Sequence, residues 1–237
     1  MEWYERNPEL FESEKSYIRR TFPDVTIHIE QGRIILRGPF PVINENDRTL
    51  RTYQLEVVFP RDYPDWIPTV CMREPGIKYE PDRHMFNNGK ACFCLPHEIP
   101  MLLGEGITFQ AFHEKLFQYW LLGQVAYDRD GNWPFSAWQH TEEGIIDAYA
   151  EITRFADRQA VKTFIRLLVR KNPAKGHEWC PCGSGLRLRQ CHRQLYDHSR
   201  ETLPSRVRDL YHSKFSLQAD TTTGEMGRHI AKDIQSR

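Results

Sequence analysis

The segment Phe59–Pro68 reads FPRDYPDWIP and has a proline at positions 60, 64 and 68. Proline has a fixed φ and no backbone N–H, so prolines at this spacing exclude an α-helix and a central β-strand. We therefore expect a rigid extended link at this point of the chain. The residues on its two sides then decide the fold.

The sequence before this link predicts one helix followed by three strands. Asn7 is a suitable helix cap with Pro8 in the first turn, and Pro23 ends the helix. Apolar and polar residues then alternate, which predicts strands at 25–29, 33–37 and 53–59. A loop with two prolines, from Gly38 to Asp47, is expected between the second and the third strand.

Helical patterns dominate the chain after the link. A short fourth strand at Thr69–Arg73 is followed by an irregular region up to Asn88. Thr108 can cap a helix in which aromatic residues recur at helical spacing, and we interpret that stripe as core. Two further helices and a linker are expected at Glu142–Phe155, Asp157–Arg170 and Asn172–Gly176.

The composition excludes several classes of protein. Hydrophobic residues make up 40% of the chain and aromatic residues 12%, which excludes a disordered chain. No apolar stretch is long enough to cross a bilayer and the N-terminus lacks the apolar run of a signal peptide, so we expect a cytoplasmic protein without a membrane partner. Cysteines stay reduced in that compartment, so the six cysteines indicate catalysis or metal binding rather than disulfides.

Charge is distributed unevenly although the formal net charge is zero. Between Ala156 and Phe215 there are 13 Lys and Arg residues against 5 Asp and Glu residues. The usual interpretation is the solvated faces of charged helices. The alternative is a C-terminal region that contacts an acidic protein or, as the weaker option, a nucleic acid.

Three cysteines and a histidine lie within 13 residues near the C-terminus. Cys180 and Cys182 stand one residue apart on a Pro- and Gly-rich turn, and Cys191-His192 follows after eight residues. Three thiolates and an imidazole make a complete tetrahedral shell for a structural zinc ion. The alternative is a set of cysteines that hold no metal.

The segment Cys180–His192 closely resembles the SEC-C motif, in which Cys-x-Cys-Gly-Ser-Gly precedes a short basic stretch and then Cys-Cys or Cys-His. The resemblance implies a zinc-held protein-interaction module, often an appendage to an enzyme. Arg187, Arg189 and Arg193 would keep its surface basic. A closed shell of four ligands leaves no position for substrate, which favours a structural ion.

A second pair of thiols, Cys92 and Cys94, lies in the segment Asn88–Pro96. Buried cysteines are usually inert, so both can be core residues, as we expect for Cys71. A strained disulfide is another possibility, and so is a partial metal site completed by His84 or His97. The residues of this segment alone leave these alternatives open.

The order of these elements resembles the ubiquitin-conjugating enzymes over residues 7–153. The prolines of Phe59–Pro68 match a segment of that family, His84 takes the place of its His-Pro-Asn motif, and Gly89-Lys90-Ala91-Cys92 matches its Gly-x-x-Cys. The resemblance implies an α+β fold with an N-terminal helix, a four-stranded antiparallel meander and C-terminal helices. A small zinc-binding module would follow this fold.

The resemblance also implies an acyl-carrying thiol and groups around it. Counting from the glycine of the motif selects Cys92, and counting ten residues from the histidine selects Cys94. We favour Cys92, because the glycine turn and the residues after it are coupled in conformation. Where the family has an oxyanion-stabilising Asn this chain has Phe86, so Asn87 and Asn88 are the candidate donors.

His84 is expected to brace the loop rather than to move protons. His97 and Glu98 follow the thiols and could act on an incoming amine. No Gly-x-Gly-x-x-Gly loop for an adenylate is visible, so activation would fall to a separate activating enzyme or be unnecessary.

Three later features resemble the bacterial branch of the family: Pro96 and the segments 138–141 and 144–149. This implies a role in antiphage defence of the CBASS type, in which the C-terminus of a cGAS-like nucleotidyltransferase is held as a thioester and passed to an amine of a target. We expect that amine to be a lysine. The alternative is a non-catalytic binding module on the same fold that docks such a tail. We expect a catalytic domain at 1–155, a basic helix and linker at 156–176, a zinc module with a following helix at 177–215, and a flexible tail at 216–237.

Overall fold

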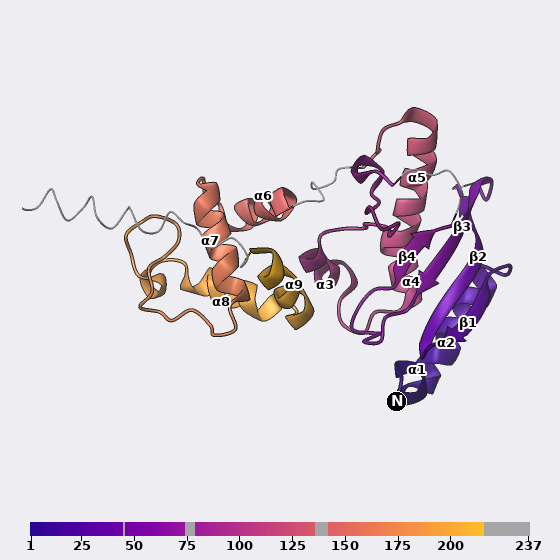
Figure 1. Ribbon diagram of the computed structural model, residues 1–237, viewed down its shortest axis with the longest axis horizontal. Helices are drawn as coiled ribbons and strands as arrows, with labels where there is room; N and C mark the ends of the chain where they lie inside the picture. The colour runs from indigo at the N-terminus through magenta and orange to yellow at the C-terminus, as the bar shows by residue number, and fades with distance from the viewer. Residues whose placement is uncertain (45, 74–78, 136–141, 216–237) are drawn as a thin grey trace, which may run out of the picture. The chain divides into compact units, whose positions relative to one another are not determined.

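The computed structural model describes residues 1–44, 46–73, 79–135 and 142–215 (Figure 1). The chain divides into two compact units, Met1–Ile145 and Ile146–Arg237. The tail expected at 216–237 and the segment 138–141 lie outside the described residues. The described elements form an α+β fold, as expected. Within the described part of the chain, no helix is both long enough and apolar enough to cross a membrane.

The described residues of the first unit form a four-stranded antiparallel sheet with the strands in chain order, which confirms the expected meander (Figure 1). Leu36, Val57 and Val70 lie opposite one another and are fully buried on one face of the sheet. The next positions, Arg37 and Glu56, point to the other face, because side chains alternate along a strand. The strands are β1 (Thr26–Glu30), β2 (Arg33–Ile43), β3 (Thr49–Val58) and β4 (Thr69–Met72).

Strand β2 is longer than its sequence predicts. The loop expected from Gly38 to Asp47 is wrong for its first half, because Gly38–Ile43 continues the strand and pairs with β3. β1 pairs with β2 only between Arg33 and Arg37, so the rest of β2 is an edge on that side. Prolines two residues apart direct their ring nitrogens to the same side of a strand. An edge tolerates this, since no ladder hydrogen bond is lost there.

The N-terminal helix begins where the sequence predicts. It forms α2 (Pro8–Thr21), after a short α1 (Trp3–Arg6), and the side chain of Asn7 accepts a hydrogen bond from the Leu10 amide at 3.1 Å. Its Glu14 is 3% exposed. The Glu14 carboxylate accepts hydrogen bonds from the Tyr63 hydroxyl and from the Phe109 amide. This side chain therefore joins α2 to the proline-containing link and to the later helices.

The link Phe59–Pro68 is neither helix nor strand, but its expected extended form is wrong. Two turns occupy it: the Tyr63 amide bonds the Pro60 carbonyl at 3.2 Å, and the Asp65 amide bonds the Asp62 carbonyl at 2.7 Å. The fixed φ of proline suits a turn as well as an extended chain, and Asp is favoured at the first position of a turn.

The helix expected after Thr108 is present as three consecutive segments. The Thr108 hydroxyl caps α4 by accepting a hydrogen bond from the Ala111 amide at 3.1 Å. Phe109, Phe112 and Trp120 are buried, which confirms this part of the aromatic stripe as core, but Tyr119 is 55% exposed and the prediction is wrong for that residue. The segments are α4 (Phe109–Phe112), the π-helical η3 (His113–Phe117) and α5 (Gln118–Asp130); before them come η1 (Pro81–Arg83), η2 (Pro96–Glu98) and α3 (Ile99–Leu103).

The described part of the second unit is helical around a loop that carries the cysteine cluster. Helix α7 lies where a helix was expected, and Asp157 caps it by accepting hydrogen bonds from the Gln159 and Ala160 amides. The Tyr196 hydroxyl accepts a hydrogen bond from the Ala174 amide at 2.7 Å and so fixes the expected linker to α8. The helices are α6 (Glu142–Thr153), whose first residues still belong to the first unit, α7 (Arg158–Val169), η4 (Leu188–Gln190), α8 (Arg193–Thr202) and α9 (Ser205–Phe215).

Candidate thiol site and candidate metal centre

The segment from His84 to Cys92 folds back on itself as a small hairpin. The Cys92 amide donates to the His84 carbonyl at 2.9 Å, Met85 faces Ala91, and the Phe86 amide donates to the Lys90 carbonyl at 2.8 Å. Gly89, at φ +78°, closes the turn in the left-handed region that glycine adopts at no steric cost. His84 and Cys92 are therefore paired at the base of the hairpin.

This hairpin is joined to the outer edge of the sheet. Lys90 forms a bridge with Cys71 of β4, and the Ala91 amide donates to the Val70 carbonyl at 2.8 Å. The region expected to be irregular is thus partly ordered, since η1 leads into the hairpin and the hairpin continues the sheet. Cys92 follows directly after the residue that bonds to β4.

Both thiols of the segment are withdrawn from solvent. Cys92 is 8% exposed, whereas Cys94 is half-buried and packs against the hydrophobic core of the unit. Burial and then the charge of Glu98 raise the pKa of Cys92 to about 12. The same two causes, followed by Cys92 itself, raise the pKa of Cys94. Both thiols are therefore protonated at neutral pH.

Glu98 and His97 follow the thiols in the chain and lie on the one-turn helix η2. A Glu98 carboxylate oxygen accepts a hydrogen bond from the Leu95 amide at 2.7 Å and so fixes the turn that carries the carboxylate. His97 is 9% exposed, and burial lowers its pKa to about 4. Its imidazole is neutral at pH 7. A carboxylate and a neutral imidazole can both accept a proton.

His84 is held firmly in an unusual conformation. Its φ is +53°, in the left-handed region that costs a residue other than glycine about 1–2 kcal/mol. The indole N–H of Trp120 donates to the His84 carbonyl at 3.0 Å. The His84 ring stacks on Trp133 at 4.1 Å between centroids. These contacts agree with a bracing role for His84.

The candidate oxyanion donors lie elsewhere on the hairpin. Asn87 and Asn88 are both exposed at its tip, and the Asn88 side chain accepts a hydrogen bond from the Lys90 amide at 3.2 Å. The structure brings His84 and Cys92 together at the base and does not bring either asparagine to them.

The sequence did not point to the residues that hold His84. Arg83 and Gln124 are buried and bonded to each other, and Trp120 and Trp133 contact His84. Trp120 belongs to the aromatic stripe interpreted as core, and Gln124 follows it at helical spacing. A polar residue in an apolar stripe is the one signal that could have found them.

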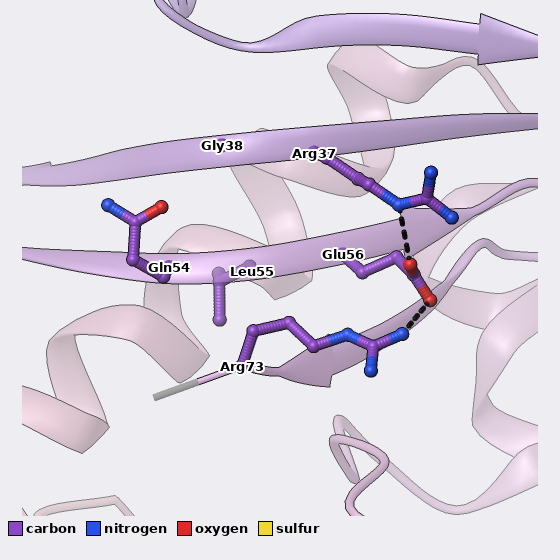
Figure 2. Close-up of a pocket in the computed structure, with 6 residues that line it drawn as sticks. All are labelled: Arg37, Gly38, Gln54, Leu55, Glu56 and Arg73. Carbon is purple, nitrogen blue, oxygen red and sulfur yellow. Dashed lines mark hydrogen bonds and ion pairs between the residues drawn. The ribbon is translucent and has the colours of Figure 1, made fainter. Parts of the chain in front are cut away.

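A pocket on the charged face of the sheet lies apart from these residues. It is lined by Arg37, Gly38, Gln54, Leu55, Glu56 and Arg73. Figure 2 shows the Glu56 carboxylate between Arg37 and Arg73, at 2.8 and 2.5 Å. Burial opposes ionisation of Glu56, but the bonds from the two arginines outweigh it and lower the pKa of Glu56. The charges of this pocket are engaged with each other, and we assign it no ligand.

The four predicted metal ligands lie together in the second unit. The donor atoms of Cys180, Cys182, Cys191 and His192 are all within 4.8 Å of one another. The Sγ atoms of Cys182 and Cys191 are 3.5 Å apart, and His192 Nδ1 lies 3.3 Å from Cys180 Sγ. Bonds of about 2.0–2.3 Å would separate tetrahedral ligands by roughly 3.5–3.8 Å. The group can therefore hold a metal ion.

A short hairpin shapes this cluster. The Cys180 amide donates to the Leu186 carbonyl at 2.9 Å, and Trp179 faces Arg187 across the two arms. Gly183 and Gly185 have φ of +78° and +70°, which lets the chain turn between the arms. The turn places Cys180 and Cys182 on one side of the cluster.

The remaining two ligands come from the start of α8. The Cys191 amide bonds the Leu188 carbonyl at 3.1 Å, and the His192 ring packs edge-on against Phe155 at 5.0 Å. Arg170 holds the base of the hairpin through paired bonds of 2.9 and 2.8 Å to Glu178. The cluster is thus built into the packing of its unit.

Comparison of the chain with protein-family models, with curated proteins and with solved structures finds no match.

Proposed function

We propose that the first unit is a ubiquitin-conjugating-like enzyme that carries an acyl group on Cys92. The observation that supports this most is the pairing of the Cys92 amide with the His84 carbonyl at 2.9 Å. This pair stands at the edge of an antiparallel meander that follows an N-terminal helix. That order is the one the family resemblance implies. Cys94, which packs against the core, has a structural role in this proposal.

The proposed chemistry is acyl transfer in two steps. The sulfur of Cys92 attacks the activated C-terminal carbonyl of a partner protein, so a C–S bond forms as the bond to the leaving group breaks. The thiol proton leaves with the departing group. An amine then attacks the thioester, forms an amide and releases the thiol. Because the pKa of Cys92 is about 12, a base must assist the first step, and we propose Glu98, whose charge acts on both thiols, as that base.

The proposed partner is a protein with a conjugatable C-terminus. The resemblance to the bacterial branch points to a cGAS-like nucleotidyltransferase in CBASS antiphage defence. A separate activating enzyme would supply the activated carboxyl group where one is required. The acceptor is an amine.

We propose zinc as the ion of the metal centre. Three thiols and one imidazole are the donor set that structural zinc prefers, and the four donor atoms lie within 4.8 Å of one another. Cys180, Cys182, Cys191 and His192 would hold the ion and join the hairpin to α8. The ion would contribute to the folding of this unit rather than to acyl transfer. The module around it is proposed as a SEC-C interaction module.

The burial of Cys92 favours a second candidate function. A thiol that is 8% exposed, with a pKa of about 12, is a poor nucleophile in the free protein. A non-catalytic module on the same fold could bind the tail of the partner without reacting with it. The two candidates differ in whether a covalent adduct forms.

The test is co-expression with the neighbouring genes, followed by mass spectrometry of the intact protein. The enzyme proposal expects a thiol-sensitive adduct on the wild-type chain. It expects a thiol-resistant ester in Cys92→Ser and a wild-type adduct in Cys94→Ser. Co-purification of a partner without an adduct in any of the three proteins would support the binding module and overturn the enzyme.

A further inference from the structure

One face of helix α5 contacts the segment Glu80–His84. Residues 120, 123, 124, 127 and 128 follow the i, i+3, i+4, i+7, i+8 spacing that places side chains on one side of a helix. Four of these side chains make a hydrogen bond to that segment: Trp120, Gln124, Tyr127 and Asp128. The fifth residue, Gly123, lies against the ring of Trp133, which stacks on His84.

The central contact is a reciprocal pair between Gln124 and Arg83. The Arg83 Nε–H donates to the Gln124 amide oxygen at 2.7 Å, and the Gln124 amide nitrogen donates to the Arg83 carbonyl at 2.9 Å. Gln124 is 0% exposed and Arg83 is 9% exposed. Burying polar and charged groups costs free energy unless each forms hydrogen bonds. An apolar pair would avoid that cost at this place in the core. The polar pair instead fixes one position of the chain.

The next residue, His84, is fixed at both its backbone and its ring. The Trp120 indole N–H reaches the His84 carbonyl at 3.0 Å. The His84 ring stacks on Trp133 at 4.1 Å, and a Cβ added at Gly123 would lie 2.3 Å from the Trp133 ring. The absence of a side chain at Gly123 therefore lets Trp133 lie against the helix. A left-handed residue held this firmly is typical of a functional site.

The His84 carbonyl also accepts the hydrogen bond from the Cys92 amide. One oxygen thus joins helix α5, through Trp120, to the thiol-bearing arm of the hairpin. We propose that Trp120, Gly123 and Gln124, here named the α5 clamp, are positioning residues for the Cys92 thiol. The clamp fixes the His84 carbonyl, and the carbonyl fixes the backbone from which the thiol projects. This inference rests on the proposed function for the use of Cys92 as the nucleophile.

The test measures alkylation of Cys92 and Cys94 by iodoacetamide in one molecule, with fragmentation mass spectrometry to separate the two sites. Two variants loosen the clamp by different routes. Gly123→Ala pushes Trp133 away from His84, and Gln124→Glu keeps an acceptor for Arg83 but removes the donor to its carbonyl. Tyr17→Phe is the control, because it removes a 2.9 Å hydrogen bond to His113 in the same unit, outside the clamp.

The clamp predicts that Cys92 alkylates at least about tenfold faster relative to Cys94 in both variants, and that its pH profile moves to lower pH as the thiol becomes exposed. Thioester yield should fall at the same time. Simple destabilisation would speed both sites alike, as in the control. A ratio within about twofold of wild type in both variants would overturn the proposal. Alkylation needs no partner, so a failure to form any thioester would count against the proposed function alone.

Discussion

The Cys92 amide lies 2.9 Å from the carbonyl oxygen of His84, a residue whose φ is +53°. The backbone position of the thiol therefore depends on a left-handed residue eight positions earlier in the chain. A change at His84 acts on Cys92 without touching its side chain.

Two substitutions at His84 distinguish the contribution of its backbone conformation to stability from that of its ring. His84→Ala loses the stack on Trp133 and keeps the cost of positive φ, whereas His84→Gly loses the stack and removes that cost. We expect the glycine variant to be more stable than the alanine variant by about 1 kcal/mol in urea-induced unfolding. Equal stability, or a more stable alanine variant, would show that the left-handed conformation is not strained.

Replacement of Glu98 should lower the pKa of the Cys92 thiol, although it also removes the base proposed for acyl transfer. Glu98→Gln removes the charge that helps to raise the pKa of Cys92 and keeps an oxygen to accept from the Leu95 amide. We expect the pH profile of Cys92 alkylation to shift to lower pH. Because burial is the larger cause, the shift should be only partial. Glu105→Gln, on an exposed turn, is the control, and an upward shift in Glu98→Gln would contradict the prediction.

Acid should destabilise the first unit through two of its described histidines. Burial lowers the pKa of both His97 and His113 to about 4, from an ordinary value near 6.5. A depressed folded-state pKa stabilises the fold above about pH 6.5, and that contribution is lost as the pH falls towards 4. We expect roughly 1–3 kcal/mol for each histidine, measured as the unfolding free energy against pH. In His113→Gln the slope between these pH values should fall by about half; an unchanged slope would exclude His113 as a source.

Removal of two cysteines should release the metal. The Cys180→Ser, Cys182→Ser variant loses two of four ligands, so we expect the loss of one equivalent of zinc in elemental analysis and a lower melting temperature for the second unit. Cys71→Ser is the matched control, because Cys71 lies on β4 in the other unit and should leave the metal content unchanged. Retention of the full equivalent in the double variant would refute the assignment.

Local signals in the sequence predicted much of this fold. The caps at Asn7 and Thr108 each depend on one side chain and the next few amides, so the residue types suffice to find them. The group that could hold a metal ion was also found from the sequence, because all four residues lie in one short segment with glycines at the turn between them.

What sequence reasoning missed depends on distant partners. The prolines at 39 and 41 break a central strand but suit an edge, and which of the two applies depends on how far β1 extends. Gln124 likewise bonds to Arg83, which lies 41 positions away in the chain, and no local sequence pattern predicts that contact. Asn87 and Asn88 were proposed as oxyanion donors because they follow Phe86, which stands where the family has its Asn; the structure places both at the exposed tip of the hairpin.

The bonds from Lys90 and Ala91 to β4 have a consequence for solubility. β4 is the last strand of the described sheet, and a bare edge there would offer its amides and carbonyls to any passing strand. The hairpin occupies part of that edge at Cys71 and Val70. Detaching it would expose a template for self-association. We therefore expect the segment that bears the thiol also to limit self-association through this edge.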